Sequence, residues 1–218
     1  QRMRFLFPFK HGLEKQRKQE LLAFQKKAGC KFKNIQLLDI AFHHRSFSNE
    51  HSDSPINNER LEFLGDAVLE LVTTDFLFSN YDKPEGILTA WRSALVRTES
   101  IGAAGERLGY EKLIRMSRGE KHGSARARQQ ILANAFEATT GAIYLDKGYE
   151  AAKKYITDNI LSTLPQILEE ESWRDPKSYL QEISQAKDGF TPVYRVIKED
   201  GPDHEKTFTL GVFVGDKK

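Results

Sequence analysis

One nine-residue run, NERLEFLGD from Asn58 to Asp66, constrains the fold more than any other part of the chain. At about 100° of rotation per residue, the apolar side chains of this run and of the residues after it fall in one arc of a helix. They are Leu61, Leu64, Val68, Leu71 and Val72. Glu59, Glu62 and Asp66 share an arc roughly opposite. The spacing therefore predicts a helix with one buried face and three carboxylates side by side.

Two consequences follow for the acidic side of this helix. Like charges so close together raise one another's pKa, so such a cluster is tolerated when it is exposed to water or neutralised by a cation. Phe63 lies on the same broad side, where a solvated helix does not ordinarily carry a large aromatic ring. The acidic side is therefore expected to meet another surface.

Composition narrows the class of protein. The chain has 218 residues, of which 39% are hydrophobic and 29% charged, as in a globular protein with one mid-sized domain and a small one. The single cysteine, Cys30, excludes an internal disulfide framework and a multi-cysteine zinc site, which fits a reducing, cytoplasmic setting. The net charge of +2 does not by itself indicate a polyanion partner. No apolar run reaches the roughly 20 residues that span a bilayer, so no membrane partner is expected.

Hydrophobic periodicity predicts an all-helical domain over residues 19–172, preceded by a basic, flexible extension over 1–18. The amphipathic segments lie near 19–28, 34–43, 58–79, 86–107, 129–145 and 149–168. Between two of them, residues 115–128 are rich in arginine, glycine and serine. Such a loop either holds a phosphate backbone or is simply solvated, and composition leaves both readings open.

The pattern changes after Glu169, Glu170 and Glu171. A short helix, 177–185, precedes two stretches rich in β-branched and aromatic residues, 191–197 and 207–214, with a turn at 201–203. This predicts a small α+β domain of order α-β-β over residues 175–218. Two strands and one helix leave the apolar face of a sheet partly open, so the domain is expected to be incomplete.

A second acidic element lies in the predicted helix 129–145. Asn134 and Glu137 are separated by one helical turn and are surrounded by small residues, which allow close helix packing. If this helix crosses the first acidic helix, the two elements together supply oxygen ligands for Mg²⁺ or Mn²⁺. Judged by spacing alone, acids on a solvated face remain the alternative for both clusters.

The run from Asn58 to Asp66 resembles the signature of the ribonuclease III family. Further motifs match in the same order: His44-Arg45-Ser46-Phe47 with Asn49-Glu50, Pro84-Glu85-Gly86 with Leu95-Val96, Arg118-Gly119-Glu120, and Ile131 to Asp146. Residues 175–218 resemble the front part of a double-stranded-RNA-binding domain, with 177–182 as its first helix and 201–204 as its loop. The final strand and last helix of that domain have no match.

The resemblance implies a homodimeric, Mg²⁺-dependent endonuclease that cuts double-stranded RNA and leaves 5′-phosphate and 3′-hydroxyl ends with short 3′ overhangs. Such enzymes process ribosomal and other structured precursors in the cytoplasm, and Mn²⁺ can replace Mg²⁺ as the cofactor. The expected partners are double-stranded RNA and a second copy of the chain, with no small-molecule cofactor.

The resemblance also implies roles for individual residues. Metal ligation is expected from Glu62, Asp66, Asn134 and Glu137, of which Asp66 and Glu137 are the catalytic pair, and Glu59 and Glu85 are further acids of the cleft. Phe63 matches a residue that inserts into the partner subunit. RNA contacts are expected from Ser178, Gln181, Glu182 and His204. Helix capping or turn formation is the alternative for Ser178 and His204.

Asn134 departs from the family pattern, since many bacterial members carry Asp beside this Glu. Asn keeps a carbonyl oxygen that can ligate a metal, but it lacks the negative charge and cannot act as a base. The main hypothesis is an active endoribonuclease with a natural Asn variant. The alternative is a double-stranded-RNA-binding protein that Asn134 has impaired in catalysis.

Overall fold

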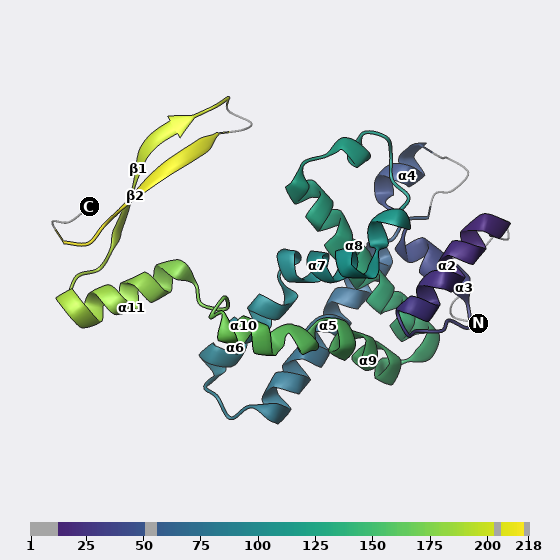
Figure 1. Ribbon diagram of the computed structural model, residues 1–218, viewed down its shortest axis with the longest axis horizontal. Helices are drawn as coiled ribbons and strands as arrows, with labels where there is room; N and C mark the ends of the chain where they lie inside the picture. Colours follow the sequence, from purple (N-terminus) through teal and green to yellow (C-terminus); the bar gives the residue numbers. More distant parts are fainter. Residues whose placement is uncertain (1–12, 51–55, 203–205, 216–218) are drawn as a thin grey trace. The chain divides into compact units, whose positions relative to one another are not determined.

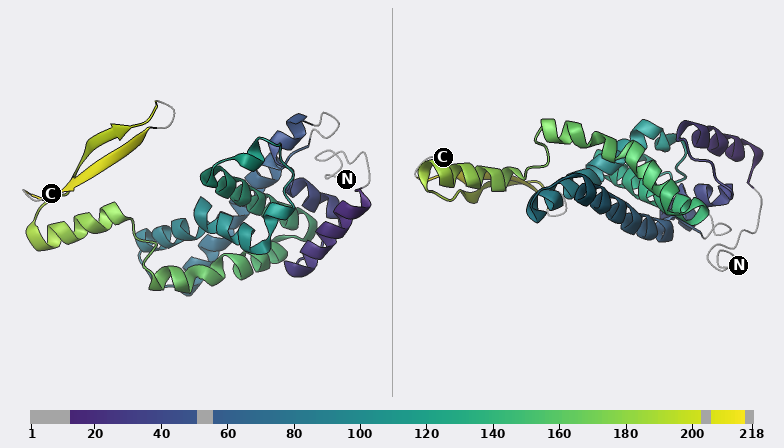
Figure 2. Two further views of the ribbon diagram at one scale, coloured as in Figure 1. Left: turned by 45° about the horizontal axis from the view of Figure 1, so that its top comes forward. Right: turned by 90° about the horizontal axis from the view of Figure 1, so that it is seen from below.

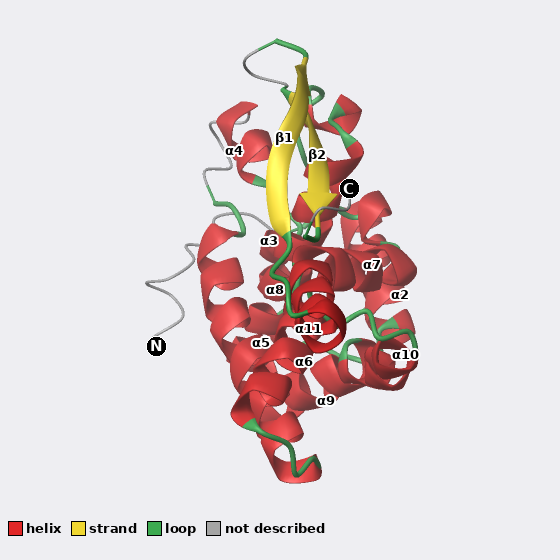
Figure 3. Cartoon of the chain, turned by 90° about the vertical axis from the view of Figure 1, so that its left-hand side faces the viewer, coloured by secondary structure: helices red, strands yellow, loops and turns green. Residues whose placement is uncertain are grey.

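The computed structural model describes residues 13–50, 56–202 and 206–215 (Figure 1). The chain divides into two compact units, Gln1–Glu170 and Glu171–Lys218. In the described residues, helices and loops make up the first unit, and both strands belong to the second (Figure 3). The predicted fold class, a mainly helical domain followed by a small α-β-β segment, is confirmed.

In its described residues, the first unit consists of α-helices joined by loops and three single turns of 3-10 helix. They are α2 (Lys15–Lys27), α3 (Ile35–Ala41), α4 (Arg45–Glu50), α5 (Glu59–Asn80), α6 (Glu85–Val96), α7 (Thr98–Leu108), η1 (Tyr110–Lys112), η2 (Glu120–His122), α8 (Ala125–Lys147), α9 (Tyr149–Asn159), η3 (Leu161–Thr163) and α10 (Leu164–Glu169). The two longest, α5 and α8, lie side by side at the centre of the unit (Figures 1 and 2). The remaining helices pack around this pair.

Two glycines allow α5 and α8 to touch backbone to backbone. A Cβ atom on Gly65 of α5 would overlap the carbonyl oxygen of Glu137 and lie 2.9 Å from the backbone nitrogen of Gly141. A Cβ atom on Gly141 of α8 would in turn overlap the carbonyl oxygen of Leu61. No other residue type leaves room for this approach. The crossing point is therefore encoded by one glycine on each helix.

Aromatic side chains form much of the core around α8. Phe24, Phe42 and Tyr110 meet edge to face, with ring centroids 4.8–5.4 Å apart. Phe136 stacks beside Tyr110 at 6.3 Å and is fully buried. Because Phe136 directly precedes Glu137, this packing fixes α8 at the place where its acidic side chain leaves the core.

A buried ion pair joins α2 to α3. Nε of Arg17 donates to Oδ1 of Asp39 at 2.6 Å, and Nη1 of Arg17 donates to the carbonyl oxygen of Leu113 at 2.8 Å. Nε2 of His43 lies 3.3 Å from the other carboxylate oxygen of Asp39. Arg17 is only 4% exposed and Asp39 only 6%. The carboxylate therefore has two cationic neighbours in a nearly dry environment whenever His43 is protonated.

The prediction of a flexible extension over residues 1–18 is wrong at its end. Helix α2 begins at Lys15, and its third residue, Arg17, is buried. A local reading of the sequence could not show this, because the partners of Arg17 lie 22 and 96 residues further along the chain. Residues 1–12 lie outside the described part of the chain.

Asp39→Asn is expected to lower the free energy of unfolding by about 3 kcal/mol at pH 7, because the buried guanidinium of Arg17 loses its counter-charge. Burial raises the pKa of Asp39, but the hydrogen bonds and charges of His43 and Arg17 outweigh burial and lower it to about 2. A lowered pKa contributes stability that is complete above the ordinary value of 3.8 and is lost as pH falls through about 2. Urea unfolding between pH 6 and pH 2 measures both effects.

The matched control is Asp158→Asn. The carboxylate of Asp158 pairs with Lys154 at 2.7 Å, but both side chains are more than half exposed. Asp158→Asn should lower the free energy of unfolding by less than about 1 kcal/mol. The variant should lose stability between pH 6 and pH 2 to the same extent as the unaltered protein. Equal effects of the two substitutions would contradict a structural role for the buried pair.

Two predicted helices are each divided in the structure. Segment 86–107 forms α6 and α7, because the backbone of Arg97 is extended and the hydroxyl of Ser100 donates to the carbonyl oxygen of Ala94. Segment 149–168 forms α9, η3 and α10. Pro165 has no backbone N–H to continue a helix from the preceding turn, so it lies in the first turn of a new helix, α10. Helix α4 was not predicted, since six residues are too few for a clear hydrophobic period.

The second unit contains α11 (Pro176–Asp188), β1 (Val193–Asp200) and β2 (Thr207–Phe213). The strands pair antiparallel, with a register shift between Val196 and Lys198. Gly201 follows β1 with φ of +96°, a conformation that favours glycine. Apolar side chains of the sheet remain about half exposed, among them Val193, Val196, Ile197, Phe208 and Leu210. The expectation of a partly open apolar face is confirmed.

Among the described helices, none combines the length and apolar character needed to cross a lipid bilayer.

Candidate active site

The start of α5 is anchored on the segment before it. Asn58 is 3% exposed, and its side-chain nitrogen donates to the carbonyl oxygen of Ala41 at 3.2 Å. Its backbone N–H donates to the carbonyl oxygen of His43 at 2.9 Å. Glu59 and Glu62 lie in the first turn of α5, where the helix dipole favours negative charge. The acidic face predicted from the spacing therefore begins at a rigid point.

Helix α8 brings Glu137 against this acidic face. The backbone of Glu137 touches Gly65 at the crossing, and Gly65 lies between Glu62 and Asp66 in the sequence. Glu62 and Glu137 are half-buried, whereas Asp66 is exposed. The crossing that the sequence left conditional is thus present, and it places three of the predicted acids together.

The carboxylates act on one another electrostatically. Burial, then the charge of Asp66, then that of Glu62 raise the pKa of Glu137 to about 8, and Glu70 adds to the effect. Burial, then Glu59, then Asp66 also raise the pKa of Glu62, which Arg45 opposes. Charges act so strongly only at short range. The negative charges of the cluster therefore repel one another, and no neighbouring cation among the described residues neutralises them fully.

The chemistry of these donors fits a hard divalent cation. They are carboxylate oxygens whose mutual repulsion a bound cation would relieve. Within the described chain, however, no three His, Cys, Asp or Glu side chains are arranged to ligate one ion together. Metal binding at Glu62, Asp66 and Glu137 therefore requires these carboxylates to turn toward one another.

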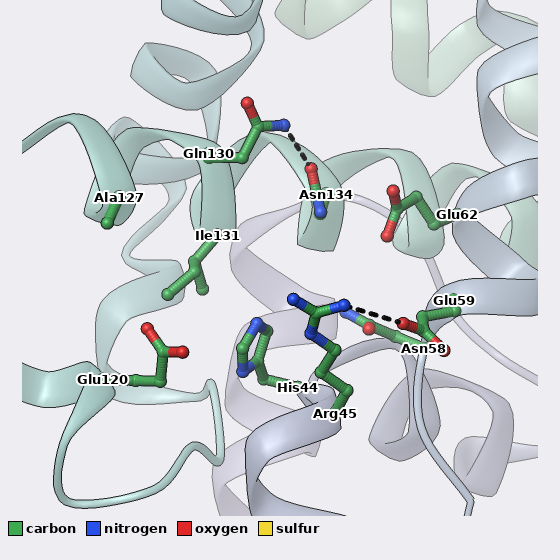
Figure 4. A pocket seen from close by; sticks show the side chains of 10 residues that line it. All are labelled: His44, Arg45, Asn58, Glu59, Glu62, Glu120, Ala127, Gln130, Ile131 and Asn134. Atoms are coloured by element: carbon green, nitrogen blue, oxygen red, sulfur yellow. Dashed lines mark hydrogen bonds and ion pairs between the residues drawn. The ribbon is translucent and has the colours of Figure 1, made fainter. Parts of the chain in front are cut away.

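A pocket of about 330 Å³ opens beside the crossing (Figure 4). Its lining residues are His44, Arg45, Asn58, Glu59, Glu62, Glu120, Ala127, Gln130, Ile131 and Asn134. The pocket thus brings together Glu59, Glu62 and Asn134 of the predicted site, while Asp66 and Glu137 do not line it. Nη1 of Arg45 lies 3.8 Å from the carboxylate of Glu59 at the rim.

Asn134 has a hydrogen-bond partner that the sequence did not indicate. Nε2 of Gln130, one turn earlier on α8, donates to Oδ1 of Asn134 at 2.7 Å. This is the carbonyl oxygen on which metal ligation by Asn134 depends. A carbonyl oxygen has a second lone pair, so ligation by Asn134 stays a prediction.

Glu85 does not join the other acids within one chain. It begins α6, accepts a hydrogen bond from the hydroxyl of Thr89 at 3.0 Å, and lines a different pocket of about 450 Å³. The lining residues of this second pocket are Thr74, Leu77, Phe78, Lys83, Glu85, Leu88, Thr89 and Arg92. These residues come from the end of α5, from α6 and, for Lys83, from the loop between them, whereas Glu59 and Glu62 lie at the start of the 22-residue α5.

The aromatic residue on the acidic side of α5 faces solvent. Phe63 is 82% exposed, and Phe78 on the same helix is 79% exposed. The insertion of Phe63 into a partner subunit remains a prediction.

The predicted RNA contacts of the second unit lie on or after α11. Ser178, Gln181 and Glu182 are exposed on this helix, while His204 lies outside the described residues. The hydroxyl of Ser178 donates to Asp175 at 2.8 Å, and Asp175 also accepts the N–H of Ser178. These hydrogen bonds are those expected from the capping alternative for Ser178, and its contact with RNA stays a prediction.

Three ionisable residues of the pocket were given no role from the sequence: His44, Arg45 and Glu120. His44 and Arg45 belong to one motif and Glu120 to another, 75 residues away. The sequence signal that could have identified them was their place in motifs that match the family in the same order. Only the packed structure shows that both motifs reach the same pocket.

Both units of the chain match known protein families. Residues 34–164 match a protein-family model described as ribonuclease-III-like, and residues 176–218 match the double-stranded RNA binding motif. The chain belongs to the ribonuclease III family. This ribonuclease III is 46% identical to ribonuclease 3 of Treponema denticola, over 97% of this chain and 87% of that protein. It is 40% identical to ribonuclease 3 of Leptospira interrogans, over 93% and 82% of the two chains.

A solved structure supports the same assignment for the first unit. The nuclease domain of ribonuclease III from Campylobacter jejuni superposes with a TM-score of 0.56 at 38% identity, covering 62% of this chain and 95% of that domain. That structure is described in terms of flexibility in a region involved in dimer formation. The present chain is thus a ribonuclease III enzyme whose nuclease domain precedes a double-stranded RNA binding motif.

Proposed function

We propose that this ribonuclease III is a Mg²⁺-dependent endonuclease that cuts double-stranded RNA to 5′-phosphate and 3′-hydroxyl ends with short 3′ overhangs. Its substrates would be ribosomal and other structured RNA precursors in the cytoplasm. The observation that carries the proposal is the glycine-mediated crossing, which holds Glu137 beside Glu62 and Asp66. Carboxylates at the junction of two rigid helices are suited to hold a divalent cation over a phosphodiester.

Each residue of the cluster has a part in this proposal. Glu62, Asp66 and Glu137 would hold Mg²⁺, or Mn²⁺ in its place, with Asn134 at the edge of the same site. When bound there, the cation activates water, neutralises the phosphate and stabilises the leaving oxygen. Glu59 lies one turn before Glu62 and lines the pocket beside the proposed metal site, against which the RNA would lie.

The second candidate is a double-stranded-RNA-binding protein with impaired catalysis. One specific observation favours it: the carbonyl oxygen of Asn134 already accepts a hydrogen bond from Gln130. An aspartate at this position would keep one oxygen for Gln130 and offer a second, charged oxygen to a metal. The two candidates therefore differ in what Asn134→Asp should do.

A labelled RNA hairpin separates the two candidates. The unaltered protein is expected to cut the hairpin in Mg²⁺ and to leave it intact with EDTA, and Asn134→Asp should change the rate by less than about tenfold. Denaturing electrophoresis shows cutting and native electrophoresis shows binding. If the unaltered protein only shifts the hairpin while Asn134→Asp cuts it, the second candidate replaces the first.

We further propose that the active form is a homodimer in which Phe63 of one subunit enters the 450 Å³ pocket of the other. Among the described large hydrophobic side chains Phe63 is the most exposed, and the pocket is lined mostly by apolar surface of α5 and α6. Glu85 lies in the wall of that pocket. Insertion of Phe63 would thus bring Glu85 near Glu59 of the other subunit, although the two lie apart within one chain.

Phe63→Ala is expected to weaken dimerisation by about thirtyfold or more, because a buried aromatic anchor at an interface is worth at least about 2 kcal/mol. Sedimentation equilibrium at several protein concentrations measures the dissociation constant. Leu22→Ala on α2, where the side chain is 48% exposed, is the control and should leave the constant unchanged. Equal dissociation constants for Phe63→Ala and the unaltered protein would refute the proposed contact.

A further inference from the structure

The tautomer of His44 is set by Ser46. The backbone N–H of Ser46 donates to Nδ1 of His44 at 3.3 Å, and the hydroxyl oxygen of Ser46 lies 2.8 Å from the same nitrogen. That hydroxyl oxygen accepts the N–H of Ser117 at 2.9 Å, so its own hydrogen can be donated to His44. Nδ1 of His44 therefore accepts from both the backbone N–H and the hydroxyl of Ser46. The hydrogen of the neutral ring must then lie on Nε2.

Nε2 of His44 is available to a ligand. The side chain lines the pocket and is half-buried, and no described residue forms a hydrogen bond with Nε2. Burial lowers the pKa of His44, although the charge of Glu120 opposes this. The ring therefore presents a neutral N–H donor to the pocket at pH 7.

Glu120 provides an acceptor close to this donor. It begins η2, and its backbone N–H donates to the hydroxyl oxygen of Ser117 at 3.3 Å. Ser117 thus helps to position both His44, through Ser46, and Glu120. The charge of Glu120 acts more strongly on His44 than any other charge, and both side chains face the same part of the pocket (Figure 4). Among the described residues, none forms a hydrogen bond or ion pair with the carboxylate of Glu120.

We propose that His44 and Glu120 form a subsite for one ribose 2′-hydroxyl of duplex RNA. Nε2–H of His44 donates to the hydroxyl oxygen, and the carboxylate of Glu120 accepts the hydrogen bond from the hydroxyl. A 2′-hydroxyl is both a donor and an acceptor, and it is the group that distinguishes RNA from DNA. This inference rests on the proposed function, because it takes duplex RNA as the substrate.

A backbone phosphate fits this wall less well. Glu59, Glu62 and Glu120 all line the pocket and repel an anion, and Arg45, the one arginine or lysine among the lining residues, is paired with Glu59. A hydroxyl is uncharged, and it can accept from Nε2–H of His44 while donating to the carboxylate of Glu120. A site built to hydrogen-bond a hydroxyl rejects the analogue that lacks it, because its own polar groups are then left unpaired.

The test is a double-mutant cycle that combines the removal of one 2′-hydroxyl from the RNA with a substitution of His44 or Glu120 in the protein. A hairpin is prepared with single 2′-deoxy nucleotides, one at a time, on both sides of the mapped cut. At one position the deoxy change should slow cleavage by the unaltered protein about tenfold, the value of a hydrogen bond to a charged group. His44→Phe and Glu120→Ala should each slow cleavage of the all-ribose hairpin about tenfold. At that one position the deoxy change should slow neither variant further.

Further variants separate the subsite from a general loss of structure. A 2′-fluoro group keeps the A-form sugar but cannot donate, so its effect should vanish in Glu120→Ala. His44→Gln keeps an N–H near the place of Nε2 and should recover most of the rate. Lys154→Ala on α9 removes an exposed charge remote from the pocket and should keep the full deoxy effect. Circular dichroism checks the fold of each variant.

Hairpin binding in Ca²⁺ gives a second readout. If the unaltered protein does not cut the all-ribose hairpin in Mg²⁺, the proposed function fails, and dissociation constants in Ca²⁺ still test the subsite. The inference is overturned if the deoxy effect is additive with both variants at every position. It is also overturned if a methylphosphonate, which removes a phosphate charge, is the change that couples to His44.

Discussion

Glu137→Gln is expected to reduce RNA cleavage by about a thousandfold or more while leaving the protein folded. Gln keeps the size and shape of Glu but lacks the negative charge that binds a divalent cation. In metal-assisted hydrolysis the cation stabilises the transition state by several kcal/mol, and this stabilisation is lost when the cation is not held. Glu137 is the member of the cluster that is held in place by the helix crossing itself. Its loss should therefore not be compensated by the exposed Asp66.

Stability should change in the opposite direction. The pKa of Glu137 is raised from 4.5 to about 8, so the folded state binds the proton more tightly than the unfolded chain. The stability that comes from this proton is complete below pH 4.5 and is lost as pH rises through about 8. Without metal, Glu137→Gln should thus remove this loss and be more stable than the unaltered protein at pH 9.

Cleavage rates in Mg²⁺ and urea unfolding in EDTA at pH 5 and pH 9 measure the two effects. Glu150→Gln on α9 is the control, because this exposed glutamate lies away from the crossing and should change neither quantity. Cleavage within tenfold of the unaltered protein would show that Glu137 does not hold the metal. A parallel fall in stability and rate would instead indicate a structural role.

Gly65→Ala is expected to lower the free energy of unfolding by about 3 kcal/mol and to slow cleavage at least a hundredfold. The new methyl group would overlap the backbone of Glu137, and a backbone atom cannot rotate away as a side chain can. Overpacking of this kind costs about 1–3 kcal/mol or more. Relief requires α5 and α8 to move apart, and a displacement of about 1 Å at reacting groups costs about a hundredfold in rate.

Gly86→Ala is the matched control for this substitution. Gly86 lies in the first turn of α6, and a Cβ atom there meets nothing within 4 Å. Alanine is the better helix former, so the stability of this variant should stay equal or rise slightly. Thermal unfolding and hairpin cleavage on both variants measure the effects. If Gly65→Ala behaves like Gly86→Ala, the close crossing does not position the acids.

Most of the buried face of α5 could be predicted because it is a local property, but Leu71, which the spacing places on that face, is 58% exposed. Rotation per residue alone sorts Leu61 from Glu62, and the family signature then assigns roles to the acids. The breaks within 86–107 and 149–168 were harder, since a side-chain hydrogen bond from Ser100 and a single proline decide them. The buried Arg17 was missed because its partners are distant in the sequence.

The amino-acid sequence by itself determined the helical class, the acidic face, the family and the identity of the acids, because periodicity and motif order survive without any three-dimensional information. Tertiary structure decided which residues meet. It alone shows that Gly65 and Gly141 let two backbones touch, that Glu85 stands apart from Glu59 in one chain, and that His44 and Glu120 share a pocket. These relations depend on packing between distant segments, and packing is set by shape complementarity that no local pattern contains.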